Sequence, residues 1–98
     1  MTTVLRLDDF AGAVQDGFDM TLGEATMALT LIEVALLPVH VFPGMIRAPF
    51  MLVFRSGQAV ILPQRIYRLQ HAGLGTIDVF LVPIGRDMQG ALYQAVFS

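Results

Sequence analysis

Two histidines and a few hydroxyl and carboxyl side chains are the groups from which a chemical site in this sequence would have to be built. His40 lies between two valines, and His71 ends a predicted strand just before a turn. Zinc and related metals are usually held by closely spaced Cys and His ligands, and the chain has no cysteine. We therefore expect no metal site and no disulfide, with both histidines at the surface or at strand ends.

The hydroxyl and carboxyl groups show no catalytic arrangement. Ser56 precedes a glycine in a turn signal, but it lacks the strand-to-helix context of a nucleophile elbow. The neighbouring acids, Asp8 with Asp9 and Asp16 with Asp19, suit helix caps and solvated turns better than acid–base pairs. The nine glycines are scattered and form no phosphate-binding loop. We expect no enzymatic activity and no cofactor.

The composition indicates one folded domain with a surplus of apolar residues. The chain has 98 residues, of which 55% are hydrophobic and 14% charged, whereas soluble domains average about 25% charged residues. This length fits a single domain over residues 1–98, and the composition excludes a disordered chain. Because small domains leave much of their surface outside the core, we expect apolar side chains on the exterior as well.

The charges are few and unevenly distributed. The net charge is -2 and every basic residue is an arginine. Residues 1–33 carry a balance of -5, and residues 34–98 carry +3. The acidic total gives no reason to expect nucleic acid as a partner. The asymmetry leaves two interpretations open, head-to-tail stacking with a second copy or charges that simply lie on solvated loops.

Neither a signal peptide nor a membrane span is predicted. The first nine residues contain no apolar signal core, and the longest apolar stretch, residues 27–42, is interrupted by Thr30, Glu33, Pro38 and His40. A membrane span needs about twenty predominantly apolar residues. We expect no membrane span and a cytoplasmic location.

Short apolar runs separated by Gly and Pro turn signals predict an all-β fold. We expect a small, partly closed barrel or a sandwich of about six mostly antiparallel strands, preceded by a short N-terminal helix. The helix is expected within residues 7–15 and a strand near residues 17–22. Residues 27–37 are rich in Ala and Leu but contain Thr30, Ile32 and Val34, so a strand is favoured and a helix stays open.

The sequence pattern of the last third of the chain predicts which residues of its strands pair. Residues 65–71 and 75–82 form a hairpin in which Arg68 faces Asp78, Gln70 faces Thr76, Leu69 faces Ile77 and Tyr67 faces Val79. A shift by one residue would place apolar side chains opposite polar ones. A second hairpin joins residues 76–84 to 90–97 and places Leu81 opposite Tyr93, Val79 opposite Ala95 and Ile77 opposite Phe97.

One face of this three-stranded unit is a core face, but the opposite face is half apolar. It combines Arg68, Asp78 and Gln94 with Ile66, Phe80, Val82, Leu92 and Val96. A solvated face should be mostly polar, so either the sheet is covered on both sides or part of it meets another protein. Arg and aromatic residues are typical of interface cores. The predicted contact residues are Phe50, Leu52, Phe54, Arg68, Asp78, Phe80 and Val82.

Most of the chain resembles an uncharacterised small bacterial family, a domain of unknown function. The resemblance lies in residues 49–55 (PFMLVFR), 62–71 (LPQRIYRLQH), 80–85 (FLVPIG) and 93–97 (YQAVF), and in the opening residues 7–10 (LDDF). The family is associated with phage-tail-collar-like genes, which implies a structural or accessory role and no activity. These residues are core and turn positions, and the resemblance implies that positions 65 and 66 vary.

We therefore expect a non-enzymatic structural or accessory protein that self-associates, as a homo-oligomer, or docks on a larger, phage-tail-like assembly. It would reside in the cytoplasm or in such a particle. The alternative is a small β-barrel carrier of a hydrophobic ligand, with the six Met and seven Phe lining an underfilled interior. An internal cavity above about 300 Å³ would favour the carrier.

Overall fold

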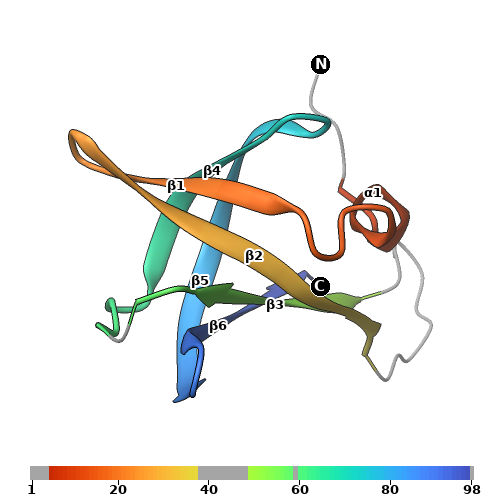
Figure 1. The fold of residues 1–98 in the computed structure, drawn as a ribbon. Helices are drawn as coiled ribbons and strands as arrows, with labels where there is room; N and C mark the ends of the chain where they lie inside the picture. Colours follow the sequence, from red (N-terminus) through yellow and green to blue (C-terminus); the bar gives the residue numbers. More distant parts are fainter. Residues whose placement is uncertain (1–4, 38–48, 59, 98) are drawn as a thin grey trace.

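The computed structural model describes residues 5–37, 49–58 and 60–97. One short helix precedes six strands, and the strands close into a barrel (Figure 1). The elements are α1 Leu7–Ala11, β1 Gly17–Leu22, β2 Ala25–Leu36, β3 Phe50–Ser56, β4 Arg65–His71, β5 Gly75–Asp87 and β6 Gly90–Phe97. The predicted all-β class, the number of strands and the short N-terminal helix are confirmed.

The strand order around the barrel is β1-β2-β3-β6-β5-β4, with every neighbouring pair antiparallel. Closure depends on β1 and β4, which pair through Asp19 with Gln70 and Met20 with Leu69. This pairing distinguishes the barrel from the sandwich that the sequence left open.

The helix α1 is shorter than the predicted range of residues 7–15. It ends at Ala11, just before Gly12. The Asp9 carboxylate accepts the backbone N–H of Arg6 over 2.8 Å, which satisfies a donor at the start of the helix. Phe10 is completely buried, and its ring lies 5.9 Å from that of Phe50 between centroids. The helix therefore closes one end of the barrel with an aromatic side chain.

Residues 27–37 form a strand, as the sequence favoured. Strand β2 buries Met27, Leu29 and Leu31 on alternate positions, which is the two-residue period of a strand with one face on a core. A register shift between Leu31 and Glu33 bends the strand against β3. His40 lies outside the described residues.

The predicted β4–β5 hairpin is confirmed residue by residue. Arg68 faces Asp78, Leu69 faces Ile77, and Tyr67 faces Val79. The Arg68 Nε donates to Asp78 Oδ1 over 3.1 Å. The alternating side chains thus lie on the two faces that the pattern predicted, with Tyr67, Leu69, Ile77 and Val79 buried and Arg68 and Asp78 outside.

The predicted pairing of β5 with β6 is wrong by two residues. Tyr93 faces Pro83 instead of Leu81, and a register shift separates Pro83 from Gly85. The strand continues to Asp87, and Met88 and Gln89 alone connect it to Gly90. The Asp87 carboxylate accepts the Gln89 N–H over 2.9 Å and so stabilises this tight turn. Because an error of two residues preserves side-chain alternation, the predicted faces remain correct before the bulge.

The barrel interior is filled by buried side chains from all six strands and from the N-terminal segment. Phe18 and Phe54 pack edge to face with ring centroids 5.2 Å apart, and Phe50 stacks on Phe97 at 4.7 Å. The buried cluster consists of Phe10, Ala13, Phe18, Met20, Met27, Leu29, Leu31, Phe50, Leu52, Phe54, Tyr67, Leu69, Ile77, Val79, Leu81, Ala91, Tyr93 and Ala95.

Candidate functional site

Three of the seven predicted contact residues lie in the core. Phe50, Leu52 and Phe54 have no exposed area. Strand β3 pairs with β2 on one side and β6 on the other, and its even-numbered positions point into the barrel. The prediction of a contact role for these three side chains must be corrected, because they fill the interior and reach no surface of this chain.

The other four predicted contact residues lie together on the outside of β4 and β5. Arg68 and Asp78 form an ion pair whose side chains are 61% and 57% exposed. Phe80 follows Asp78 by two positions on the same face and is 50% exposed. Val82, two positions further along β5, is half-buried.

Two exposed residues that were not selected from the sequence complete this surface. Ile66 lies directly opposite Phe80 in the β4–β5 pairing and is 68% exposed. Val96 lies on β6, two positions beyond the residue opposite Val82, and is 55% exposed. We call Ile66, Phe80, Val82 and Val96 the outer apolar face. The alternation of the strands had assigned Ile66 and Val96 to this side, so the signal was present in the sequence.

No described element covers the outer apolar face. Ile66, Phe80 and Val96 are each at least half exposed on this side of the barrel. A second ion pair joins the end of β3 to the end of β5, where the Arg55 guanidinium holds the Asp87 carboxylate at 2.7 Å. The hydrogen bond from Arg55 keeps the pKa of Asp87 below its usual value.

The arrangement most similar to a catalytic dyad is His71 with Asp16. Their Nε2 and Oδ2 atoms are 2.8 Å apart. The other ring nitrogen, Nδ1, accepts the backbone N–H groups of Gly73 and Leu74, both at 3.0 Å. Both nitrogens are thus engaged within the protein, and the ring also stacks on Phe18 with 4.5 Å between centroids. This histidine closes a turn and joins β4 to the start of β1, and it is not positioned as a base.

Ser56 is also engaged in structure. It is completely buried, and its hydroxyl donates to the backbone carbonyl of Gln58 over 3.1 Å. The turn after β3 therefore uses this hydroxyl to satisfy its own backbone.

In a comparison with known protein families, nearly the whole length of the chain matches one family. Residues 5–97 match the domain of unknown function DUF6916. The chain belongs to the DUF6916 family. No curated protein and no solved structure matches it.

The described part of this DUF6916 domain contains neither a cluster of metal ligands nor a helix able to span a membrane. In residues 5–37, 49–58 and 60–97 no three His, Asp or Glu side chains gather as metal ligands. The same residues include no helix with the length and apolar character needed to cross a membrane. The outer apolar face of the DUF6916 domain combines residues of β4, β5 and β6, and three of its four residues are at least half exposed.

Proposed function

We propose that this protein is a non-enzymatic structural or accessory protein that associates with a second copy of itself through the outer apolar face. The observation that carries the proposal is the direct pairing of Ile66 with Phe80 on the outside of the β4–β5 hairpin, where both are at least half exposed. Exposed apolar patches on a folded domain mark contact sites when they are contiguous. Val82 extends the patch along β5, and Val96 extends it onto the neighbouring strand β6.

The charges beside the patch suit a second copy. Arg68 and Asp78 lie side by side at its edge and are both largely exposed. A two-fold contact brings the same surface of two copies together. In such a contact the Arg68 of one copy can approach the Asp78 of the other, so opposite charges meet and no like charges need to face one another.

The expected association is weak. Fully burying one large apolar side chain contributes about 1.5–3 kcal/mol, and the residues of this face are already partly covered by their neighbours. Association also costs several kcal/mol of lost freedom. We expect a dissociation constant in the micromolar range, which a repeated assembly can strengthen through multiple contacts.

We further propose that the protein is bacterial and that such contacts serve a phage-tail-like assembly, either in the cytoplasm or in the finished particle. The support for this step is the sequence resemblance to a family associated with phage-tail-collar-like genes. Capture of tail-like components with the tagged wild-type protein from its host, and their loss with the Phe80→Glu variant, is the expected result. Capture that is unchanged by this substitution would show that another surface docks.

The filled interior argues for a building block over a carrier. The aromatic side chains Phe18, Phe54 and Phe50 contact their neighbours inside the barrel, and the buried side chains of the described strands form one cluster. A hydrophobic ligand would have to displace these packed side chains.

The proposal is tested by the mass of the protein in solution. Phe80→Glu places a charge at the centre of the face, and we expect it to convert a concentration-dependent dimer into a monomer in sedimentation velocity. Met88→Glu is the matched control, because Met88 is fully exposed at the β5–β6 turn and outside the face. Circular dichroism melting checks that both variants are folded. A wild-type protein that stays monomeric at millimolar concentration would overturn the proposal.

A further inference from the structure

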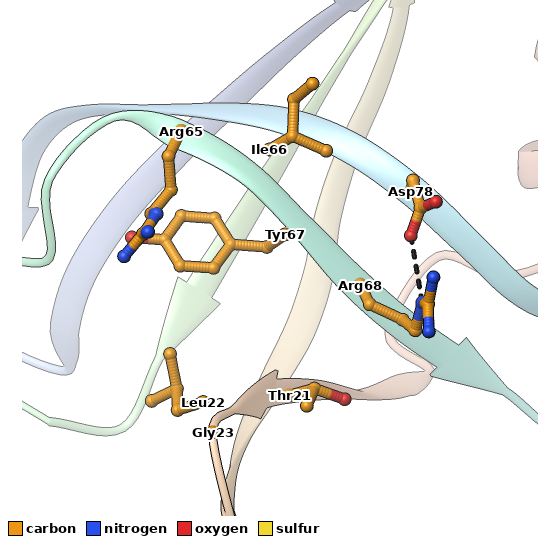
Figure 2. A pocket seen from close by; sticks show the side chains of 8 residues that line it. All are labelled: Thr21, Leu22, Gly23, Arg65, Ile66, Tyr67, Arg68 and Asp78. Carbon is orange, nitrogen blue, oxygen red and sulfur yellow. Dashed lines mark hydrogen bonds and ion pairs between the residues drawn. The ribbon is translucent and has the colours of Figure 1, made fainter.

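The barrel is open at one end of its closing seam. Strands β1 and β4 pair at Asp19 with Gln70 and Met20 with Leu69, and then separate. A pocket of about 430 Å³ lies where they part, lined by Thr21, Leu22, Gly23, Arg65, Ile66, Tyr67, Arg68 and Asp78. In Figure 2, Leu22 of β1 lies across this pocket from the Tyr67 ring of β4. We call this pocket the open seam.

Both walls of the open seam are strand edges. Residues 65–68 pair with β5 on one side, and among the described residues they have no ladder partner on the β1 side. Thr21 and Leu22 likewise pair only with β2. Unpaired strand edges present backbone N–H and C=O groups, and an extended peptide can add to them as a further strand.

The open seam also carries an arginine without an acidic partner among the described residues. The Arg65 guanidinium lies 5.8 Å from the centre of the Tyr67 ring, and no carboxylate in the described part of the chain pairs with it. Arg68 lies on the same strand and forms an ion pair with Asp78. The pocket therefore combines edge backbone, an aromatic wall and an exposed guanidinium.

We propose that the open seam binds one extended peptide segment, which adds to β4 as a strand and places a carboxylate on Arg65. Arginine holds a carboxylate through two parallel N–H donors, so an acidic segment is favoured over a neutral or basic one. A second copy of this chain is a poor occupant, because pairing β4 with itself would bring Arg65 and Arg68 of both copies together. The preference for an acidic segment rests on Arg65 and is proposed for this chain.

This site adjoins the surface used in the proposed function, but it binds in a different way. The dimer contact uses the side chains of Phe80 and its neighbours, whereas the open seam uses the backbone of β4. Ile66, Arg68 and Asp78 belong to both the dimer contact and the lining of the seam, so none of them is changed in the test. Phe80→Glu should leave peptide binding unchanged, and Arg65→Glu should leave the oligomeric state unchanged.

The probe is a fluorescent nine-residue peptide of alternating Thr and Val with one central Glu. Two matched peptides carry a central Lys, or N-methyl groups that remove the backbone donors on one edge. We expect the Glu peptide to bind at least about tenfold more tightly than either. Arg65→Glu should reverse the preference between Glu and Lys, while Arg86→Glu, the same charge change at the far end of β5, should not.

Amide hydrogen exchange locates the bound peptide independently of affinity. Saturation with the Glu peptide should slow exchange in residues 65–68 at least about tenfold, as expected for newly paired strand amides. Equal binding of the Glu and Lys peptides, or of the N-methylated peptide, would overturn the proposal. So would unchanged exchange in residues 65–68, or no binding of the Glu peptide up to about 1 mM.

Discussion

At the scale of single residues, His71 makes more interactions than its place at a strand end suggested. It bonds Asp16, accepts two backbone N–H groups of the following turn and stacks on Phe18. Because Nδ1 is an acceptor for both N–H groups, the ring proton lies on Nε2 and is donated to Asp16. The side chain connects residues 55 positions apart, which the sequence spacing could not reveal.

We predict that His71→Ala lowers the free energy of unfolding by about 2–3 kcal/mol. The loss combines hydrogen bonds left unmade in a largely buried position with a lost ring contact. Urea titration measures it. His71→Asn should recover part of the loss, because an Asn carbonyl can accept the N–H groups of the turn. Equal losses for His71→Ala and His71→Asn would show that the turn does not depend on this acceptor.

The ionisation of Tyr67 is expected to lower the stability of the protein in alkaline solution. Burial raises the pKa of its hydroxyl above the ordinary value, although the nearby Arg65 opposes the shift. A raised pKa in the folded state stabilises the protein fully below the unfolded-state pKa of about 10. That stability is lost as the pH rises through the folded-state pKa.

The Tyr67→Phe variant should therefore lose less stability than the wild type between neutral pH and pH values above about 10. At neutral pH it should be less stable by about 1 kcal/mol, because the hydroxyl donates to the Pro63 carbonyl over 2.6 Å. Urea titrations at several pH values measure both effects. The same alkaline loss in both proteins would contradict the assignment to Tyr67.

At the scale of elements, the close approach of β6 to the end of β3 depends on Gly90. A Cβ there would overlap the Ser56 carbonyl oxygen, and the residue has a φ of 145°. The neighbouring Ala91 N–H donates to the Gln58 carbonyl over 3.1 Å, so the two backbones are held together at this point. Only glycine satisfies both the conformation and the space.

Gly90→Ala should destabilise the protein by at least about 3 kcal/mol, because backbone atoms would have to move. Gly57→Ala is the control in the turn after β3, where a Cβ meets nothing within 4 Å, and it should change stability by less than about 1 kcal/mol. Thermal unfolding followed by circular dichroism separates the two. Similar melting temperatures for both variants would show that β6 can shift away from Ser56.

The strand pairings show what local patterns can predict. The β4–β5 register follows from alternation, because a slip by one residue would exchange polar and apolar faces. The β5–β6 register escaped prediction, since a slip by two residues preserves the faces and the decisive Asp87–Gln89 bond is a local geometric detail. The choice between a barrel and a sandwich stayed open, because the pairing of β1 with β4 that decides it joins segments far apart in the sequence.

The predicted contact residues show a similar limit to what the sequence pattern can predict. A strand that is apolar at every position, such as residues 50–54, is expected to be buried on both of its sides. Its pattern does not indicate which side faces the interior of the barrel. Phe50, Leu52 and Phe54 were therefore assigned to a surface although they fill the core. On β4 and β5 polar residues mark the outer side, and there Arg68, Asp78, Phe80 and Val82 were placed together correctly.

At the scale of the whole molecule, the barrel explains why an apolar face remains outside. A closed six-stranded sheet has one interior, and the described core already fills it. Apolar residues in excess of that volume must lie on the exterior, where Ile66, Phe80 and Val96 are at least half exposed. The surplus seen in the composition thus becomes a surface of defined position, beside one balanced ion pair.

The association of two copies through this surface is tested most directly by isotope-filtered NMR on a mixture of carbon-13-labelled and unlabelled protein. The two-fold contact predicts intermolecular signals between the Phe80 ring of one copy and the methyl groups of Ile66, Val82 or Val96 of the other. Intermolecular signals confined to other strands, such as β1 and β2, would contradict it, as would their absence at concentrations where a dimer sediments.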